Sequence, residues 1–262
     1  MERHQRITIA LGDEVSMLRR GAPLRNVEAV VLPELVDGGY RALASGRGTH
    51  QVGDEFWREM REASQRLATT IVAGSVRLAS GRARPTNTSL VFARGRLLHR
   101  YDKIHLFRPT GDDRYFHPGR RLGSFRLAGR SGRTRRAAVV LCYDLRFPEL
   151  IRALALKGTE ILFVPARWPA ARDLAWRTLL RARAIENQMF VVGCNAPDRE
   201  GGRSYVYGPG GEELMGGTRV GTRGPVRVVL PMALLDRARR LHRALDEAVV
   251  LQATGFPRWL AP

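Results

Sequence analysis

Three reactive side chains in this chain each follow a short apolar run. They are Glu34 after Val30-Val31-Leu32-Pro33, Lys103 after Leu97-Leu98 and Tyr101-Asp102, and Cys142 after Val139-Val140-Leu141. Apolar runs of this length predict buried strands, and sites in α/β folds are built where strands end. We therefore expect the three side chains to meet at one edge of the fold.

A cysteine, a glutamate and a lysine form a complete set for nucleophilic hydrolysis. The thiolate of Cys142 would attack an electrophilic carbon, and Glu34 would take the thiol proton and later activate water. Lys103, helped by a backbone N–H beside the nucleophile, would stabilise the oxyanion of the tetrahedral intermediate. Each residue also has a structural explanation: a helix cap for Glu34, a surface charge for Lys103 and core packing for Cys142.

Lysine usage makes Lys103 harder to explain as a surface charge. The 262 residues include 44 Lys or Arg and 25 Asp or Glu, for a net charge of +19. Only Lys103 and Lys157 are lysines, so 44 − 2 = 42 of the basic residues are Arg. This surplus indicates a compositional bias toward Arg. A lysine kept against that bias is worth examining, because it is a compact donor with an adjustable pKa, whereas arginine is a broad planar fork.

The same charge keeps a polyanion-binding protein open as an alternative of another class. The Arg-rich run 130–136 does not favour it, because the run lacks the interleaved aromatic residues that stack on nucleic-acid bases. We therefore expect no specific nucleic-acid partner. A hydrophobic content of 44% excludes global disorder.

The elements that must position these residues alternate between strand and helix patterns. Strands are predicted over 6–11, 28–32, 71–78, 88–92, 124–127, 137–141, 160–165, 189–193 and 225–230, and helices over 54–70, 149–157, 173–187 and 232–244. Gly95 between two apolar pairs predicts a hairpin. Such alternation predicts packed α and β layers. Without a fixed repeat or a long linker, we expect a single domain over residues 1–262.

Two further patterns concern the compartment. No apolar stretch approaches the roughly 20 residues of a membrane span, and residues 1–12 lack the apolar segment of a signal peptide. Two cysteines, Cys142 and Cys194, are too few for a disulfide scaffold. These patterns predict a cytoplasmic protein with no membrane partner, in which Cys194 serves core packing.

The three motifs resemble those of the nitrilase (carbon–nitrogen hydrolase) superfamily, in the order in which its members carry them. The glutamate motif spans 30–35 with Gly39-Tyr40, the lysine motif spans 101–107, and the nucleophile motif spans 141–149; supporting matches are Asn87-Thr88, 115–119, Trp176, 181–188, Asn195 and 202–211. The resemblance implies an α+β fold, a four-layer α-β-β-α sandwich. It also implies a homodimer joined through a helical face, with no metal and no organic cofactor.

Roles carried over from the resemblance make Cys142 the nucleophile, Glu34 the general base and Lys103 the oxyanion stabiliser. The backbone N–H of Tyr143 would complete the oxyanion hole. A small-molecule amide would form a thioester, release ammonia and then be hydrolysed. The motifs most resemble the ω-amidase-like branch, whose members deamidate ω-amides of dicarboxylates such as 2-oxoglutaramate. A nitrilase or an N-carbamoyl hydrolase with the same triad is the alternative.

Two positions depart from the family pattern. Many members carry a second glutamate a few residues after the lysine, where this chain has Asp112, with Asp113 as a second candidate. Within the segment 165–169, Arg167 stands before Trp168 where Asn is frequent. Arg167 either faces solvent or lines the pocket with Trp168. In the pocket, Arg167 or Arg146 could pair with a substrate carboxylate.

Overall fold

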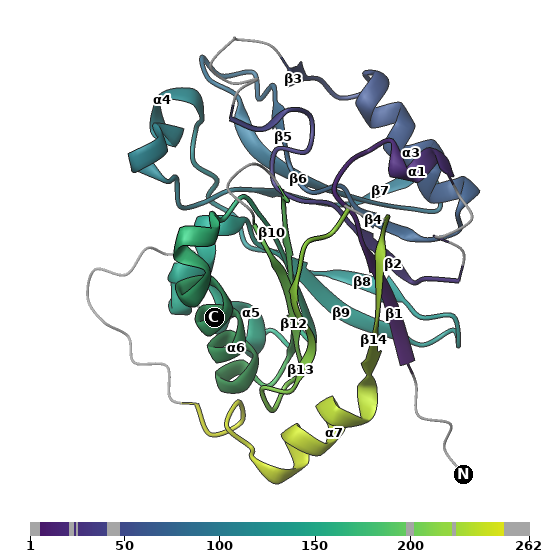
Figure 1. Cartoon of the computed structure of the whole chain (residues 1–262), viewed down its shortest axis with the longest axis vertical. Helices are drawn as coiled ribbons and strands as arrows, with labels where there is room; N and C mark the ends of the chain where they lie inside the picture. Colours follow the sequence, from purple (N-terminus) through teal and green to yellow (C-terminus); the bar gives the residue numbers. More distant parts are fainter. Residues whose placement is uncertain are drawn as a thin grey trace.

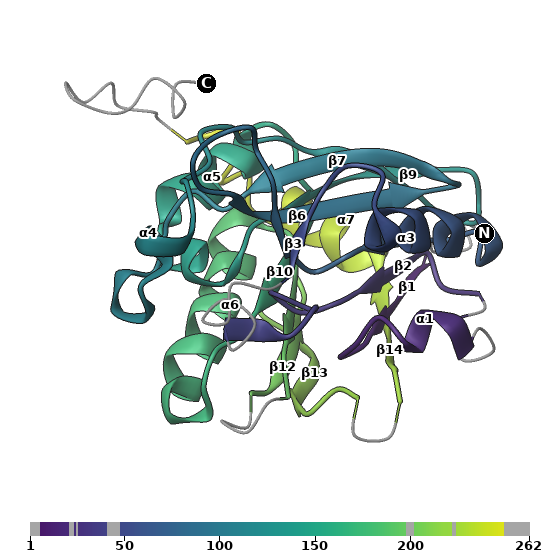
Figure 2. The same cartoon turned by 90° about the horizontal axis from the view of Figure 1, so that it is seen from above.

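The computed structural model describes residues 6–20, 24, 26–40, 48–197, 202–221 and 224–248. Two β-sheets lie face to face, and helices cover the outer face of each sheet (Figures 1 and 2). This arrangement confirms the predicted α+β class and the four-layer α-β-β-α sandwich. The single domain over 1–262 stays a prediction, and it extends beyond the described residues at both ends.

The first sheet has the order β14-β1-β2-β4-β6-β5-β3, with β7 also paired to β6. Its strands are β1 (Arg6–Leu11), β2 (Ala29–Val31), β3 (Thr49–His50), β4 (Thr70–Val72), β5 (Val76–Leu78), β6 (Thr86–Ala93), β7 (Arg96–Asp102) and β14 (Val226–Pro231). Strands β1, β2 and β4 run parallel. Their carboxyl ends therefore share one edge, and the chain after β2 reaches Glu34 there.

The second sheet has the order β13-β12-β11-β10-β9-β8. Its strands are β8 (Phe125–Ala128), β9 (Thr134–Val139), β10 (Ile161–Ala166), β11 (Phe190–Asn195), β12 (Ser204–Tyr207) and β13 (Glu213–Thr218). Strands β9, β10 and β11 are parallel. The chain leaves β9 toward Cys142 and leaves β10 toward Arg167, so both residues follow neighbouring strand ends.

Helices α1 (Met17–Arg20) and α3 (Glu55–Arg66) cover the first sheet, and α5 (Pro148–Leu156) and α6 (Asp173–Asn187) cover the second (Figure 2). Helix α4 (Asp112–Tyr115) lies in the segment after the lysine motif, and α7 (Met232–Leu241) follows β14. Short 3₁₀ turns are η2 (Arg108–Thr110), η3 (Cys142–Arg146) and η4 (Ala170–Arg172). Asp54 caps α3 by accepting a hydrogen bond from the Trp57 N–H at 2.9 Å.

Alternating side chains of the first sheet divide the core in two. In β1, Ile9 and Leu11 join the cluster that contains the second sheet, whereas Ala10 joins the cluster built with Phe56 and Met60 of α3. Both faces of the sheet are therefore buried, which explains why its strands appear in the sequence as continuous apolar runs.

The run 71–78, predicted as one strand, is split into β4 and β5 at Gly74. Gly74 has φ +58°, and a Cβ there would lie 1.9 Å from the carbonyl oxygen of Pro33. Glycine is required because the β4–β5 connection presses against the chain just before Glu34. Strands β12 and β13 and helix α4 were not predicted, because their sequences lack the periodicity on which the prediction relies.

Candidate active site

The ends of β2 and β7 bring Glu34 and Lys103 into direct contact. The Nζ of Lys103 donates to Oε1 of Glu34 at 2.8 Å and to Oδ2 of Asp112 at 2.8 Å. All three side chains are buried from solvent. The structure thus gathers a cation and two carboxylates from three separate segments, as the motif spacing predicts for Glu34 and Lys103.

The two oxygens of Glu34 have different surroundings. Oε1 accepts from Lys103 and also from Nδ2 of Asn87 on β6, at 3.0 Å. Oε2 is buried and has no hydrogen-bond partner among the residues that the structure describes. A buried carboxylate oxygen without a donor is costly. One oxygen is therefore fixed in place while the other stays open to accept a proton.

The surroundings of Lys103 stabilise its charged form. Burial alone would lower its pKa, but the negative charges around it, Glu34 foremost, raise that pKa well above the ordinary value of a lysine. An ammonium has three N–H donors, and the two carboxylates take two of them. The third remains to bind an oxyanion in the site.

Cys142 occupies a strained turn directly after β9. Its φ of 43° is in the left-handed region, which is rare for a residue with a Cβ. Burial, and then the charge of Glu34, raise the pKa of the Cys142 thiol well above its ordinary value, although Lys103 and the backbone N–H of Arg167 act in the opposite direction. The thiol is therefore protonated at neutral pH and needs a base to react.

Asp144 fastens the nucleophile turn to the lysine motif. Its Oδ2 accepts from the Tyr101 hydroxyl at 2.8 Å and from the Leu141 N–H at 3.1 Å. Its Oδ1 accepts from the His105 N–H at 2.8 Å and pairs with His105 Nδ1 at 2.9 Å. Asp144 is fully buried. Sequence reasoning gave it no role, although its place two residues after Cys142 in the nucleophile motif was a usable signal.

Asp112, at the start of α4, takes the place expected of the second acid. Besides Lys103, its carboxylate accepts from the Phe107 N–H at 3.1 Å and from the Thr110 hydroxyl at 3.1 Å. The alternative candidate, Asp113, is exposed. The shorter aspartate therefore reaches Lys103 directly, because the loop from Phe107 folds around it.

The guanidinium of Arg167 is turned onto the backbone of the glutamate motif. Its Nε donates to the Glu34 carbonyl at 2.8 Å and its Nη2 to the Leu35 carbonyl at 3.0 Å. The side chain is half-buried. The expectation that Arg167 either faces solvent or pairs with a substrate carboxylate needs correction, because main-chain carbonyls occupy the Nε–Nη2 fork that would hold a carboxylate.

Two other arginines lie over aromatic rings of the site segments. The guanidinium of Arg146 is 5.0 Å from the ring centre of Trp168, and that of Arg172 is 5.6 Å from the ring centre of Phe107. The indole N–H of Trp168 donates to the Arg172 carbonyl at 3.0 Å. Both arginines are exposed, and Trp168 is buried. These contacts orient two cations beside the nucleophile turn.

Tyr40 and Tyr143 also belong to the surroundings of the site. Tyr40 packs against buried Leu35 and Phe116, and burial, followed by the charge of Glu34, raises the pKa of its hydroxyl well above the ordinary value. The ring of Tyr143 contacts Phe107, with centroids 4.9 Å apart. Tyr40 was part of the matched glutamate motif but was not singled out as a site residue.

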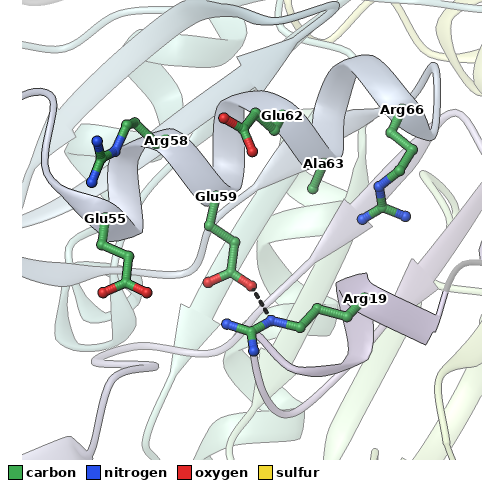
Figure 3. A pocket seen from close by; sticks show the side chains of 7 residues that line it. All are labelled: Arg19, Glu55, Arg58, Glu59, Glu62, Ala63 and Arg66. Carbon is green, nitrogen blue, oxygen red and sulfur yellow. Dashed lines mark hydrogen bonds and ion pairs between the residues drawn. The ribbon is translucent and has the colours of Figure 1, made fainter.

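A hollow elsewhere on the surface lies between α1 and α3 (Figure 3). Charged side chains line it, and Arg19 donates to Glu59 at 2.7 Å. None of the predicted site residues borders this hollow. Across the described part of the chain, no group of three or more His, Cys, Asp or Glu side chains is placed to hold a metal ion. No helix within the described ranges is long and apolar enough to cross a membrane.

Comparison with known proteins identifies the class. The model of the carbon-nitrogen hydrolase family matches residues 11–234, and the chain belongs to that family. It is therefore an enzyme that hydrolyses carbon–nitrogen bonds.

Curated relatives resemble the chain over most of its length. The 2-oxoglutaramate amidase of Bacillus subtilis is 34% identical over 200 residues, covering 74% of this chain and 75% of the relative. The omega-amidase YafV of Escherichia coli is 34% identical over 239 residues, covering 88% of this chain and 83% of the relative.

Solved structures agree on the fold. A CN-hydrolase superfamily protein of Xanthomonas campestris is 26% identical and has a TM-score of 0.79, covering 95% of this chain and 98% of that one. A nitrilase-superfamily protein of Saccharomyces cerevisiae, 21% identical, has a TM-score of 0.75 over 90% of this chain and 94% of its own and is similar in fold.

Proposed function

We propose that this enzyme is an amidase that hydrolyses a small amide bearing a carboxylate, through a thioester on Cys142. One observation carries the proposal: Lys103 holds one oxygen of Glu34 at 2.8 Å, and the other oxygen is buried and unpartnered. That arrangement fits a base poised to take a proton from a thiol of raised pKa.

In the first half-reaction, Glu34 takes the proton of the Cys142 thiol, and the sulfur attacks the amide carbon. The developing oxyanion is stabilised by the remaining N–H of Lys103 and by the backbone N–H of Tyr143. When the tetrahedral intermediate collapses, the carbon–nitrogen bond breaks. The leaving nitrogen receives the proton from Glu34 and departs as ammonia, leaving a thioester.

In the second half-reaction, water replaces ammonia. Glu34 takes a proton from water, and the resulting hydroxide attacks the thioester carbonyl, with Lys103 again stabilising the oxyanion. Collapse breaks the carbon–sulfur bond, and the proton on Glu34 returns to the sulfur. The products are a carboxylic acid and the free Cys142 thiol. Asp112 holds Lys103 in place throughout, because it accepts the second of its hydrogen bonds.

The relatives' names and two arginines support a substrate carboxylate. Those relatives are a 2-oxoglutaramate amidase and an omega-amidase. Arg146 and Arg172 place exposed guanidiniums over Trp168 and Phe107, next to the nucleophile turn and the lysine motif. Guanidiniums bind carboxylates through paired N–H donors. We propose that these two arginines bind the carboxylate, with Trp168 as the wall between them and the thiol.

A comparison of two amides tests the substrate class. Ammonia release should be faster from succinamate than from 4-oxopentanamide, which is neutral and of about the same size. In Arg146→Met and Arg172→Met, KM for succinamate should rise about tenfold, while KM for the neutral amide should stay unchanged. A preference of the unaltered enzyme for the neutral amide would overturn the carboxylate requirement.

Three alternatives are separated by other assays. A nitrilase would release ammonia from the nitrile analogue of succinamate, and an N-carbamoyl hydrolase would release carbon dioxide from a carbamoyl compound. A polyanion binder would bind DNA with an affinity that falls steeply as the salt concentration rises.

We place the enzyme in the cytoplasm as a homodimer, on the basis of the resemblance and the cysteine content. Cell fractionation would test the compartment, and sedimentation would test the oligomeric state.

A further inference from the structure

Arg167 contacts the glutamate motif in a way that a surface or substrate-binding arginine would not. Its Nε and Nη2 donate side by side to two successive carbonyls, those of Glu34 and Leu35, at 2.8 and 3.0 Å. Gly39 permits this approach, because a Cβ there would lie 2.7 Å from the Arg167 Cζ. The segment 34–39 is thus wrapped around a planar fork.

The backbone that Arg167 holds is strained. Leu35 has φ 47°, in the left-handed region, and its orientation is over-determined by three contacts. Its N–H donates to the Ser75 hydroxyl at 3.0 Å on one side. Its carbonyl accepts from the Gly39 N–H at 2.9 Å and from Arg167 on the other. Without the guanidinium, the two carbonyls lose their common donor, and only the contacts with Ser75 and Gly39 still hold the strained residue.

The position of Arg167 is itself fixed from the second sheet. It follows the last residue of β10, and the next residue, Trp168, is clamped by Asn195 of β11. The Trp168 N–H donates to Asn195 Oδ1 at 2.7 Å, and Asn195 Nδ2 donates to the Trp168 carbonyl at 2.8 Å. The backbone N–H of Arg167 also faces the thiol of Cys142. One residue therefore touches the nucleophile with its backbone and the backbone of Glu34 with its side chain.

We propose that Arg167 is a positioning residue that sets the placement of Glu34 relative to Cys142. Oε1 of Glu34 is held by Lys103 and Asn87, and the Glu34 side chain also interacts with the Cys142 thiol, so the placement of the carboxylate relative to the thiol depends on the backbone that carries it. Arg167 supplies that rigidity by joining the end of β10 to the chain after β2. This inference rests on the proposed roles of Glu34 and Cys142. Its test distinguishes a failure of those roles from a failure of the positioning role of Arg167.

Alkylation of Cys142 by iodoacetamide is the test, because it needs the base and the thiol but no substrate. The intact enzyme should be labelled at Cys142 near neutral pH, and Glu34→Gln should slow the labelling strongly. Arg167→Met should slow it about 10- to 100-fold, the usual cost of misplacing a reacting group by about 1 Å. Arg167→Lys should fall between, because an ammonium can reach one carbonyl but cannot imitate the fork.

Arg239→Met provides the matched control. Arg239 of α7 also donates to two main-chain carbonyls, those of Gln188 and Thr159, at 3.3 and 2.8 Å. Neither carbonyl belongs to a site segment. Its loss should lower the unfolding temperature while leaving the alkylation rate unchanged. Unfolding temperatures of all variants then separate general destabilisation from misplacement of the base.

Each outcome decides a different claim. If Glu34→Gln does not slow alkylation, the proposed triad fails and Arg167 has nothing to position. If Glu34→Gln slows it and Arg167→Met does not, the triad stands and the positioning role is overturned. In turnover, Arg167→Met should lower kcat for succinamate and for 4-oxopentanamide equally, with KM nearly constant. A rise in KM for succinamate alone would instead make Arg167 a substrate-carboxylate ligand.

Discussion

The turn that carries Cys142 and the turn that carries Glu34 reach similar strain by different means. Cys142 has φ 43°, and Leu35, next to Glu34, has φ 47°. The nucleophile turn is held by its own Asp144, which binds Leu141 within the turn and His105 beyond it. The glutamate turn is held from a distance, by Ser75 and Arg167. A strained backbone is thus held in place either by a nearby side chain or by partners from distant segments of the chain. Loss of a partner should therefore have different effects on the two turns.

Loss of the nucleophile should have the largest effect. Cys142→Ala should reduce amide turnover to the background rate, since no thioester can form. The unfolding temperature should change little, because the turn that carries Cys142 is held by Asp144 and not by the thiol. The control is Cys194→Ala, which removes a fully buried thiol that lies against the carbonyls of Gly12 and Val31. That variant should lose stability and keep its turnover; the opposite pattern would exchange the roles of the two cysteines.

Replacement of Lys103 by arginine should come next. Lys103→Arg keeps the charge but brings a broad planar fork into a space where a single nitrogen contacts two carboxylates at 2.8 Å. We expect kcat/KM to fall at least about 100-fold, measured by ammonia release. The control is Lys157→Arg, at an exposed position after α5, which should be indistinguishable from the unaltered enzyme. Near-normal turnover by Lys103→Arg would refute an oxyanion role for the ammonium.

Asp144→Asn tests the locally held turn. The carboxylate of Asp144 accepts hydrogen bonds from the surrounding N–H and O–H groups. The NH2 of an amide side chain would face some of these donors, and two donors cannot form a hydrogen bond with each other. The free energy of unfolding should fall by about 3 kcal/mol in urea titrations, and kcat should fall with it. Asp102→Asn is the control: Asp102 accepts from Thr88 and Arg100 at a half-exposed position, so it should lose less than about 1 kcal/mol. Equal losses of unfolding free energy in the two variants would show that Asp144 stabilises the fold no more than a partly exposed carboxylate does.

The smallest effect concerns an outer contact of the glutamate turn. His50 Nε2 pairs with Asp37 at 3.0 Å, and Nδ1 pairs with Asp54 at 2.8 Å. The hydrogen bond to Asp37, foremost, raises the pKa of His50, although burial opposes it. A raised folded-state pKa means that the stabilisation is complete below the unfolded value of about 6.5 and is lost as pH rises through the folded value.

His50→Gln should therefore cost more stability at about pH 5.5 than at about pH 9, by less than about 1 kcal/mol. Urea titrations of both proteins at the two pH values measure the difference. A larger cost at the higher pH would mean that the imidazole acts as a neutral hydrogen-bonding group. A change in kcat that follows the same pH dependence would show that protonation of His50 affects the glutamate turn through its contact with Asp37.

Sequence reasoning predicted the parts of the site that short motifs carry. Glu34, Lys103 and Cys142 each end an apolar run, so their meeting followed from strand patterns and from the family motifs. The layers followed from alternating helices and strands, as α6, predicted over 173–187, illustrates. What could not be predicted depends on contacts between distant segments. The direction of Arg167 is set by carbonyls more than 130 residues earlier in the chain, and no local pattern encodes such a contact.

The lysine content of the chain has a practical consequence. Of its two lysines, Lys103 is buried between carboxylates and Lys157 is exposed after α5. Amine-reactive esters should therefore modify the native enzyme at one side chain, apart from the terminal amine. A single fluorophore or surface linkage can then be attached through Lys157 without engineering. Appearance of a second labelled lysine would report unfolding of the site itself.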